Sequence, residues 1–178
     1  MKNLHVHSYL FFFLGISIFC SSFCPLNKPQ GDFCTVLTTY VVDAKTDFEA
    51  VKGEKDAAET KPDAQTAYKA KVSLIAPFTK AYVMETKGNQ GVTCLNLRVY
   101  FKSVGELKGN YEALCADLEE CLPNNLWNSL RKSATATYQQ NTTNGTASFT
   151  TIQVNTQTNI GMTDKFWLDL RVWYTKRD

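Results

Sequence analysis

Residues 92–101 read VTCLNLRVYF, and this stretch decides the fold. Four apolar side chains fall on one side of an extended chain: Leu95, Leu97, Val99 and Phe101. The other side carries four residues of mixed character: Cys94, Asn96, Arg98 and Tyr100. This alternation with a period of two predicts a central strand with one buried face.

A partner for this strand precedes it in the sequence. Residues 78–86 form another β-rich run, and the Gly-Asn-Gln-Gly turn at 88–91 separates the two runs. Two β-rich runs joined by so short a glycine-containing loop predict a β-hairpin, on which the rest of the chain must pack.

Strands and helices follow from composition and spacing in the rest of the chain. The β-branched run after Cys34 predicts a strand, and it is counted with five others: 34–42, 78–86, 92–101, 133–140, 147–155 and 166–175. Helical spacing predicts three helical stretches: 43–60, 63–75 and 110–121. Gly105 and Gly109 are expected to interrupt the chain before the last helix, and no internal repeat is expected.

The N-terminal residues resemble a signal peptide. Residues 10–19 are apolar but too few to span a bilayer, and small residues follow at Ser21 and Ser22. We expect cleavage after Ser22, secretion, and one folded domain over 23–178, while a membrane anchor is the alternative for residues 1–22. We expect no membrane segment in the mature chain.

The charge balance is nearly neutral. Removal of residues 1–22 removes Lys2 and no acid, which lowers the formal charge from +2 to +1. Lysines also alternate with acids, as in KGEKD at 52–56, instead of forming a basic stripe. This pattern argues against a nucleic-acid partner.

Five cysteines remain after removal of the leader: Cys24, Cys34, Cys94, Cys115 and Cys121. Export makes disulfide pairing the default. Cys115 and Cys121 are too far apart along a continuous helix to bridge each other, so each should pair elsewhere. Because five is odd, one thiol stays free, pairs between chains, or has its partner in residues that this chain lacks. No spacing suits a metal site.

The catalytic groups of common enzyme classes are absent from the mature sequence. Both histidines, His5 and His7, lie in the expected leader, which removes imidazole-based catalysis. A carboxylate pair such as Asp164 and Asp169 has no further support. We therefore expect no enzyme activity and no cofactor.

The last strand carries an unusual set of side chains in FWLDLRVWY, residues 166–174. Its odd positions are Trp167, Asp169, Arg171 and Trp173. In a simple sheet this face is solvated, with an Asp–Arg pair and two exposed indoles. In a closed barrel it lines a cavity, where an aromatic box with one acid suits a small cation or an amphiphile. In a third interpretation the same residues anchor a protein interface.

Two glycosylation sequons lie close together, at Asn141 and Asn144, and both fall in an expected loop. Asn144-Gly145 is also a hairpin-turn signal between two β-rich runs. We expect a glycan on at least one of them.

Four short strings resemble the tick salivary lipocalins, which include histamine-binding proteins: DAQTAYK (63–69), FTKAYVMET (78–86), TCL (93–95) and VWYT (172–175). The resemblance implies a lipocalin-like antiparallel β-barrel. It also implies a carrier that sequesters a biogenic amine, such as histamine or serotonin, or a lipid mediator, and so modulates host defence. The Gly-x-Trp mark of lipocalins is missing, and no ligand-binding residue can be matched.

Two hypotheses therefore stand. The first is a mainly β carrier of lipocalin type, and the second is an α+β interaction module, such as a protease inhibitor of cystatin-like build, with helix 43–75 across the sheet. A barrel of lipocalin type needs about eight strands, and only six are counted. With the odd cysteine, this predicts that the domain is incomplete at its C terminus or dimerises through the exposed edge of strand 166–175 or a free thiol.

Overall fold

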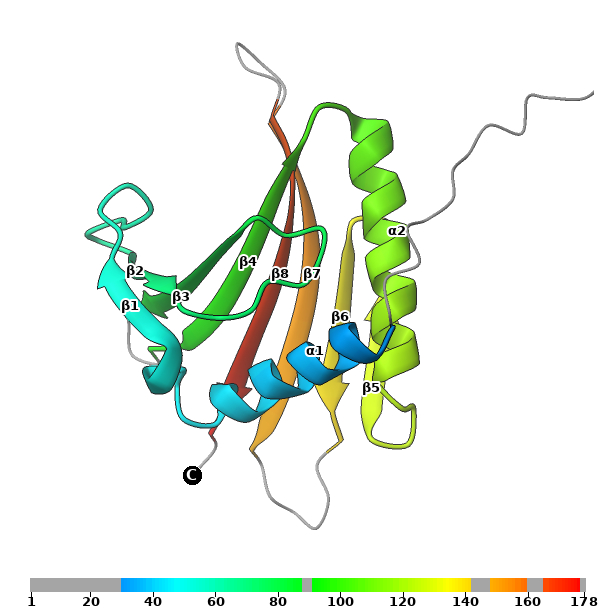
Figure 1. Cartoon of the computed structure of the whole chain (residues 1–178), viewed down its shortest axis with the longest axis horizontal. Helices are drawn as coiled ribbons and strands as arrows, with labels where there is room; N and C mark the ends of the chain where they lie inside the picture. Colours follow the sequence, from blue (N-terminus) through cyan, green and yellow to red (C-terminus); the bar gives the residue numbers. More distant parts are fainter. Residues whose placement is uncertain (1–29, 88–90, 142–147, 160–164, 177–178) are drawn as a thin grey trace, which may run out of the picture.

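The computed structural model describes residues 30–87, 91–141, 148–159 and 165–176. These ranges form one antiparallel eight-stranded sheet with two α-helices, in the spatial order β1-β2-β3-β4-β8-β7-β6-β5 (Figure 1). The strands are β1 Lys52–Lys55, β2 Gln65–Ala70, β3 Lys80–Thr86, β4 Thr93–Phe101, β5 Trp127–Arg131, β6 Thr135–Gln140, β7 Phe149–Asn159 and β8 Lys165–Thr175. The helices are α1 Gln30–Ala44, α2 Val104–Cys121 and the short 3-10 turn Glu49–Val51.

The sheet is mainly antiparallel β structure, as expected, but it is not closed into a barrel. β1 and β5 are its two edges, since each pairs with one neighbour in the described residues. The described residues form eight strands. Five of the six expected strands are among them, the sixth (34–42) is helical, and β1, β2 and β5 were not expected. The expected exposed edge at 166–175 is wrong, since β8 lies at the centre between β4 and β7.

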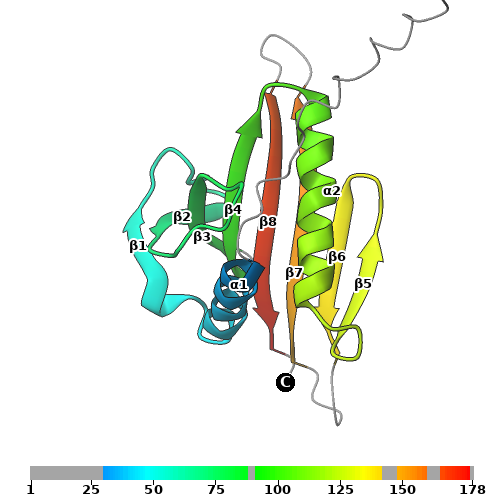
Figure 2. The same cartoon turned by 45° about the vertical axis from the view of Figure 1, so that its right-hand side comes forward.

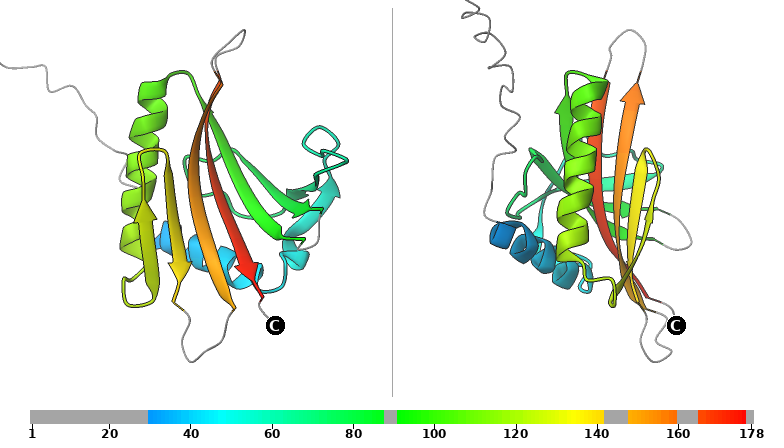
Figure 3. Two further views of the ribbon diagram at one scale, coloured as in Figure 1. Left: turned by 180° about the vertical axis from the view of Figure 1, so that it is seen from behind. Right: turned by 90° about the vertical axis from the view of Figure 1, so that its right-hand side faces the viewer.

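Both helices pack on one face of the sheet. The inward side chains of α1 and α2 share one core cluster with Leu97 of β4, Leu170 of β8 and Val154 of β7. Figure 2 shows both helices in front of the sheet, and the view from behind in Figure 3 shows the strands in front of the helices. The arrangement is therefore helix on sheet, and the opposite face, which we call the helix-free face, carries no helix of the described residues.

The first helix replaces the strand expected at 34–42. Leu37, Tyr40 and Ala44 recur at helical spacing and are buried against the sheet. The hydroxyls of Thr38 and Thr39 donate to the carbonyls four residues before them, so these residues stay compatible with a helix. Tertiary burial of one face thus overrides the β preference of the composition.

The two helices expected at 43–60 and 63–75 are also wrong. The end of α1, the 3-10 turn, β1 and a loop occupy the first range, and β2 occupies part of the second. Gly53 is needed for the β1–β2 pairing, because a Cβ there would lie 2.4 Å from the Lys69 carbonyl oxygen. The helix that crosses the sheet is therefore not 43–75.

The hairpin and the later helix are confirmed. β3 pairs antiparallel with β4, which is central, and its Leu95 and Leu97 are fully buried. The helix expected at 110–121 exists but begins earlier, at Val104, because Ser103 caps it by accepting from the Glu106 amide. The two glycines expected to interrupt the chain lie inside its first turns.

The two halves of the chain repeat one arrangement, which corrects the expectation of no repeat. Each half is a helix followed by a four-stranded meander, and the halves meet where β4 pairs antiparallel with β8. The paired strands have similar sequences, CLNLRVYF at 94–101 and WLDLRVWY at 167–174. The buried helix residues recur with the same spacing: Leu37, Tyr40 and Ala44 in α1, and Tyr111, Leu114 and Leu118 in α2.

One disulfide joins the two helices, between Cys34 near the start of α1 and Cys121 at the end of α2. The expectation that Cys121 pairs elsewhere than with Cys115 is confirmed, whereas Cys94 and Cys115 are free among the described residues. Burial raises the pKa of the Cys94 thiol to about 11. Cys24 lies outside the described residues, as does the expected signal peptide 1–22.

Only one of the two sequon asparagines, Asn141, lies within the described residues. Asn141 is described, and its side-chain Nδ2 donates to the Asn125 carbonyl oxygen at 3.1 Å. Asn144 lies outside the described residues. No helix in the described ranges combines the length and apolarity needed to cross a membrane.

Candidate functional site

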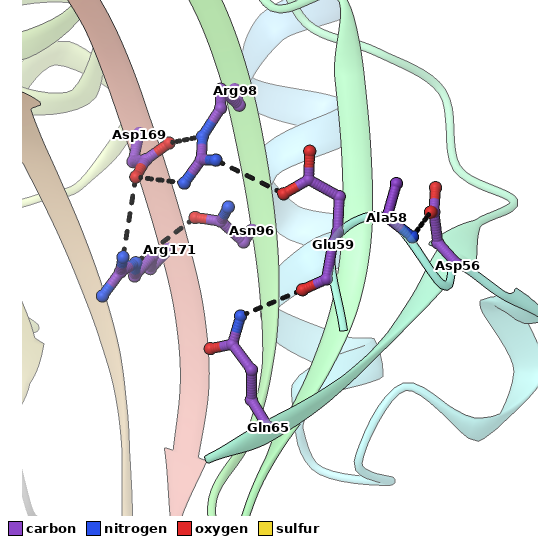
Figure 4. Close-up of polar contacts among 8 residues, drawn as sticks. All are labelled: Asp56, Ala58, Glu59, Gln65, Asn96, Arg98, Asp169 and Arg171. Atoms are coloured by element: carbon purple, nitrogen blue, oxygen red, sulfur yellow. Dashed lines mark hydrogen bonds and ion pairs between the residues drawn. The ribbon is translucent and has the colours of Figure 1, made fainter. Parts of the chain in front are cut away.

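The most unusual polar cluster lies on the helix-free face, along the line where β4 meets β8. Four cross-strand pairs form this line, which we call the β4–β8 seam: Cys94 with Trp173, Asn96 with Arg171, Arg98 with Asp169, and Tyr100 with Trp167. They share one face because side chains alternate along both strands. Figure 4 shows the polar centre of the seam.

Asp169 is the most tightly held charge of the seam. It is 1% exposed, and both of its oxygens accept from Arg98, from Nε at 2.7 Å and from Nη2 at 3.0 Å. The hydrogen bond to Asp169 raises the pKa of Arg98. Arg171 also approaches Asp169, with Nη2 3.5 Å from Oδ2. Two guanidinium groups thus satisfy this carboxylate.

Asn96 differs, because it is fully buried and only half satisfied. Its Oδ1 accepts from Arg171 Nε at 3.3 Å. Its Nδ2 is buried and has no hydrogen-bond partner. An unpaired buried N–H costs about 1–3 kcal/mol, so this position favours a further acceptor.

Aromatic rings flank the polar centre at one end of the seam. The Trp167 ring lies 5.8 Å from the Arg98 guanidinium and 6.3 Å from the Tyr100 ring. The indole Nε1 of Trp167 is buried without a partner. At the other end, Trp173 pairs with Cys94 and is half-buried. Apolar surface therefore adjoins donors on both sides.

The loop between β1 and β2 folds over one side of this centre. Its Glu59 carboxylate lies 3.6 Å from Arg98 Nη1, and the Glu59 carbonyl accepts from the Gln65 side chain at 3.3 Å. Figure 4 shows both residues beside Asn96, opposite Arg171. The loop thus supplies a second carboxylate, and it contacts Arg98 and not Arg171.

An open pocket of about 330 Å³ adjoins the seam across β3. Its lining combines apolar side chains of the β2–β3 connection with two lysines, Lys69 and Lys80. The lining residues are Asp56, Lys69, Ala70, Val72, Leu74, Thr79, Lys80, Ala81 and Tyr82. Tyr82 connects the two regions, since it lines the pocket and is the cross-strand neighbour of Asn96. This volume lies at the lower end of the range for small-ligand sites.

Comparison with known proteins adds no identity. No family model, curated protein or solved structure matches this chain. The resemblance to the tick salivary lipocalins therefore stays an expectation from the sequence.

The four residues singled out from the sequence do lie together on one face of β8. The opposite face is core, as expected, since Leu168, Leu170 and Val172 are fully buried. The expectation of a solvated pair between Asp169 and Arg171 is wrong in one respect, because Asp169 is buried and its main partner is Arg98. The sheet is open, so this face does not line a barrel interior.

Sequence reasoning missed Asn96, Arg98 and Glu59 as site residues. The signal was present in part, because LNLR at 95–98 repeats LDLR at 168–171. Two similar strands that pair antiparallel place each arginine opposite the other strand's Asn or Asp. Glu59 had no such signal, because a loop contact depends on the whole fold.

The chemistry available at the seam is binding. Arginine, amide and indole donors point to ligands that accept hydrogen bonds, and the rings offer apolar contact. Within the described residues, no group of three or more His, Cys, Asp or Glu side chains is placed to hold a metal ion.

Proposed function

We propose that this protein is an exported carrier that binds a small amphipathic ligand at the β4–β8 seam and the adjoining pocket. The observation that carries the proposal is the buried Asn96 Nδ2 without a partner, beside Arg171 and the aromatic rings. A ligand acceptor would satisfy this amide. The protein acts by sequestering the ligand and not by catalysis.

The carrier proposed here uses the open face of a sheet instead of a barrel interior. Of the ligands that the resemblance implies, a lipid mediator suits the seam better than a biogenic amine. An amine would need a carboxylate as its counter-charge, but both oxygens of Asp169 already accept from Arg98, and the Glu59 carboxylate lies 3.6 Å from Arg98 Nη1. Export is proposed from residues 1–22, as before.

Tryptophan fluorescence tests this function, because two of the three tryptophans lie on the seam. Titration with histamine, serotonin and decanoate should change the emission with decanoate. The change should persist in Trp127→Phe, whose ring lies in the core on the helix side, and shrink in Trp173→Phe. If none of the three ligands changes the emission of the wild type, the carrier function is rejected.

A protein-interaction module, including a protease inhibitor, is the second candidate. The observation that favours it is the β5 edge, where Leu130 is 62% exposed. Edge strands present unpaired backbone groups to extended partners. Two results together would establish this alternative: the wild type binds none of the small ligands, and Leu130→Lys abolishes binding of a protein partner.

A further inference from the structure

The seam contains the same kind of cross-strand pair twice. β4 carries LNLR at 95–98 and β8 carries LDLR at 168–171. Because the strands are antiparallel, Arg98 faces Asp169 and Arg171 faces Asn96. The two pairs are therefore equivalent positions of the repeated halves.

The two pairs differ in one respect that matters for binding. Arg98 faces a carboxylate that accepts from two of its nitrogens. Arg171 faces an amide in the equivalent position, and that amide accepts one hydrogen bond while its Nδ2 has no partner. The pair formed by Arg171 and Asn96 thus offers donors and positive charge with no carboxylate at its own register, while the Asp169 carboxylate of the other pair lies 3.5 Å from Arg171 Nη2.

We propose that Arg171 and Asn96 bind the carboxylate of the ligand, an inference that rests on the proposed function. The Arg98–Asp169 pair shows that a guanidinium at this register donates to both oxygens of a carboxylate. A ligand carboxylate would accept from Arg171 and from Asn96 Nδ2, both of which are donors. An ammonium group would find no acceptor there beyond those already in use.

Access to this position is from the side of Arg171. Its side chain is 39% exposed, while Asn96 is fully buried. Glu59 and Gln65 lie on the other side of the amide in Figure 4, and because Asn96 Nδ2 is buried, the proposed binding requires these side chains to shift when a carboxylate reaches it. The apolar part of the ligand then lies against Trp173, the next residue of β8 on the same face.

Three ligands with one tail and different head groups test the inference: decanoate, decan-1-ol and decylamine. Each is titrated against the tryptophan emission of the full chain. Decanoate should bind about tenfold more tightly than the other two, which corresponds to about 1.4 kcal/mol. Preference for decylamine or decan-1-ol would overturn the carboxylate site and leave the carrier function standing.

Two substitutions locate the head group. Asn96→Asp installs the missing carboxylate opposite Arg171, so it should weaken decanoate binding about tenfold or more and leave decan-1-ol binding unchanged. Arg171→Gln should have the same selective effect through loss of the cation. Asn128→Asp makes the same charge change on the exposed β5 strand and should bind decanoate like the wild type.

The outcomes distinguish failure of the carboxylate site from failure of the carrier function. If Asn96→Asp and Arg171→Gln both bind decanoate as the wild type does, the carboxylate site is wrong while the carrier function holds. If no member of the series binds the wild type, both fail together. Denaturant unfolding of each variant shows whether a loss of binding reflects a loss of folding.

Discussion

At the scale of single residues, the pair of Arg98 and Asp169 is the most buried ion pair of the described chain. Asp169 is 1% exposed and the Arg98 side chain 17% exposed, so solvent screens the pair weakly. Removal of one partner from a buried pair leaves the other charge uncompensated. The pair therefore stabilises the pairing of β4 with β8 and is also part of the seam.

Asp169→Asn should lower the free energy of unfolding by about 3 kcal/mol, because Arg98 keeps its charge and loses its main acceptor. Urea unfolding followed by circular dichroism measures the change. Glu112→Gln is the matched control, since it removes the exposed ion pair with Arg131 and should cost less than about 1 kcal/mol. Equal losses in the two variants would contradict the burial of the Arg98–Asp169 pair.

Ionisation of the Tyr40 hydroxyl should make the free energy of unfolding depend on pH in the alkaline range. Its hydroxyl donates to the Ser73 carbonyl, and burial raises its pKa from 10.0 to about 12. A raised pKa means that the folded state holds the proton more tightly than the unfolded state does. The resulting stability is fully present below pH 10 and is lost as the pH rises through about 12.

The free energy of unfolding should therefore fall between pH 10 and pH 12, and it should fall less steeply in Tyr40→Phe. Urea unfolding at a series of pH values measures both slopes. Tyr111, whose pKa burial also raises to about 12, keeps part of the slope in the variant. Identical slopes in the two proteins would show that Tyr40 ionises freely in the folded state.

At this scale the sequence predicted which side of each central strand is buried but not what its polar residues contact. Alternation alone separates Leu168 and Leu170 from Asp169 and Arg171. The partner of Asp169 depends on the register between β4 and β8, which are far apart in the chain. Only the repeat of LNLR and LDLR carried that information.

At the scale of elements, predictions succeeded where local and tertiary preferences agree. β4 alternates, is rich in β-branched and leucine residues, and is central, so it was found. The threonines and valines of α1 favour a strand, yet burial of Leu37 and Tyr40 fixes it as a helix. β1 and β5 are short edge strands with little apolar content, so periodicity could not reveal them.

The disulfide between α1 and α2 should contribute strongly to stability. It closes a loop of 87 residues, and loops of this length correspond to about 4.6 kcal/mol in the chain-entropy description. Replacement of both Cys34 and Cys121 by alanine should lower the unfolding free energy by about that amount. Urea unfolding with and without reductant measures it.

The reductant itself provides the control for this prediction. It should destabilise the wild type and have no effect on the double variant, because Cys94 and Cys115 form no disulfide in the described residues. Peptide mapping after alkylation of the unfolded, unreduced protein should show label on Cys94 and Cys115 and none on Cys34. Label on Cys34 would contradict the bridge.

At the scale of the whole molecule, the repeated halves explain why the site lies at the centre of the sheet. Each half contributes a helix and a four-stranded meander, and β4 and β8 are the strands through which the halves meet. The seam therefore draws its residues equally from both halves. A ligand at the seam would bind across the junction and stabilise it.

The core is shared between the halves, so neither half should fold alone. α1, in the first half, contacts β8 of the second, and α2 contacts β4 of the first. Residues 23–102 and 103–178, expressed separately, should each lack cooperative unfolding.

Expressed together in an oxidising compartment, they should assemble through β4 and β8 and be joined by the disulfide between Cys34 and Cys121. A non-reducing gel should then show one linked species that separates with reductant, and circular dichroism should show cooperative unfolding of that species alone. Cooperative unfolding of 23–102 by itself would contradict the shared core, because a four-stranded sheet with one helix would then suffice to bury α1.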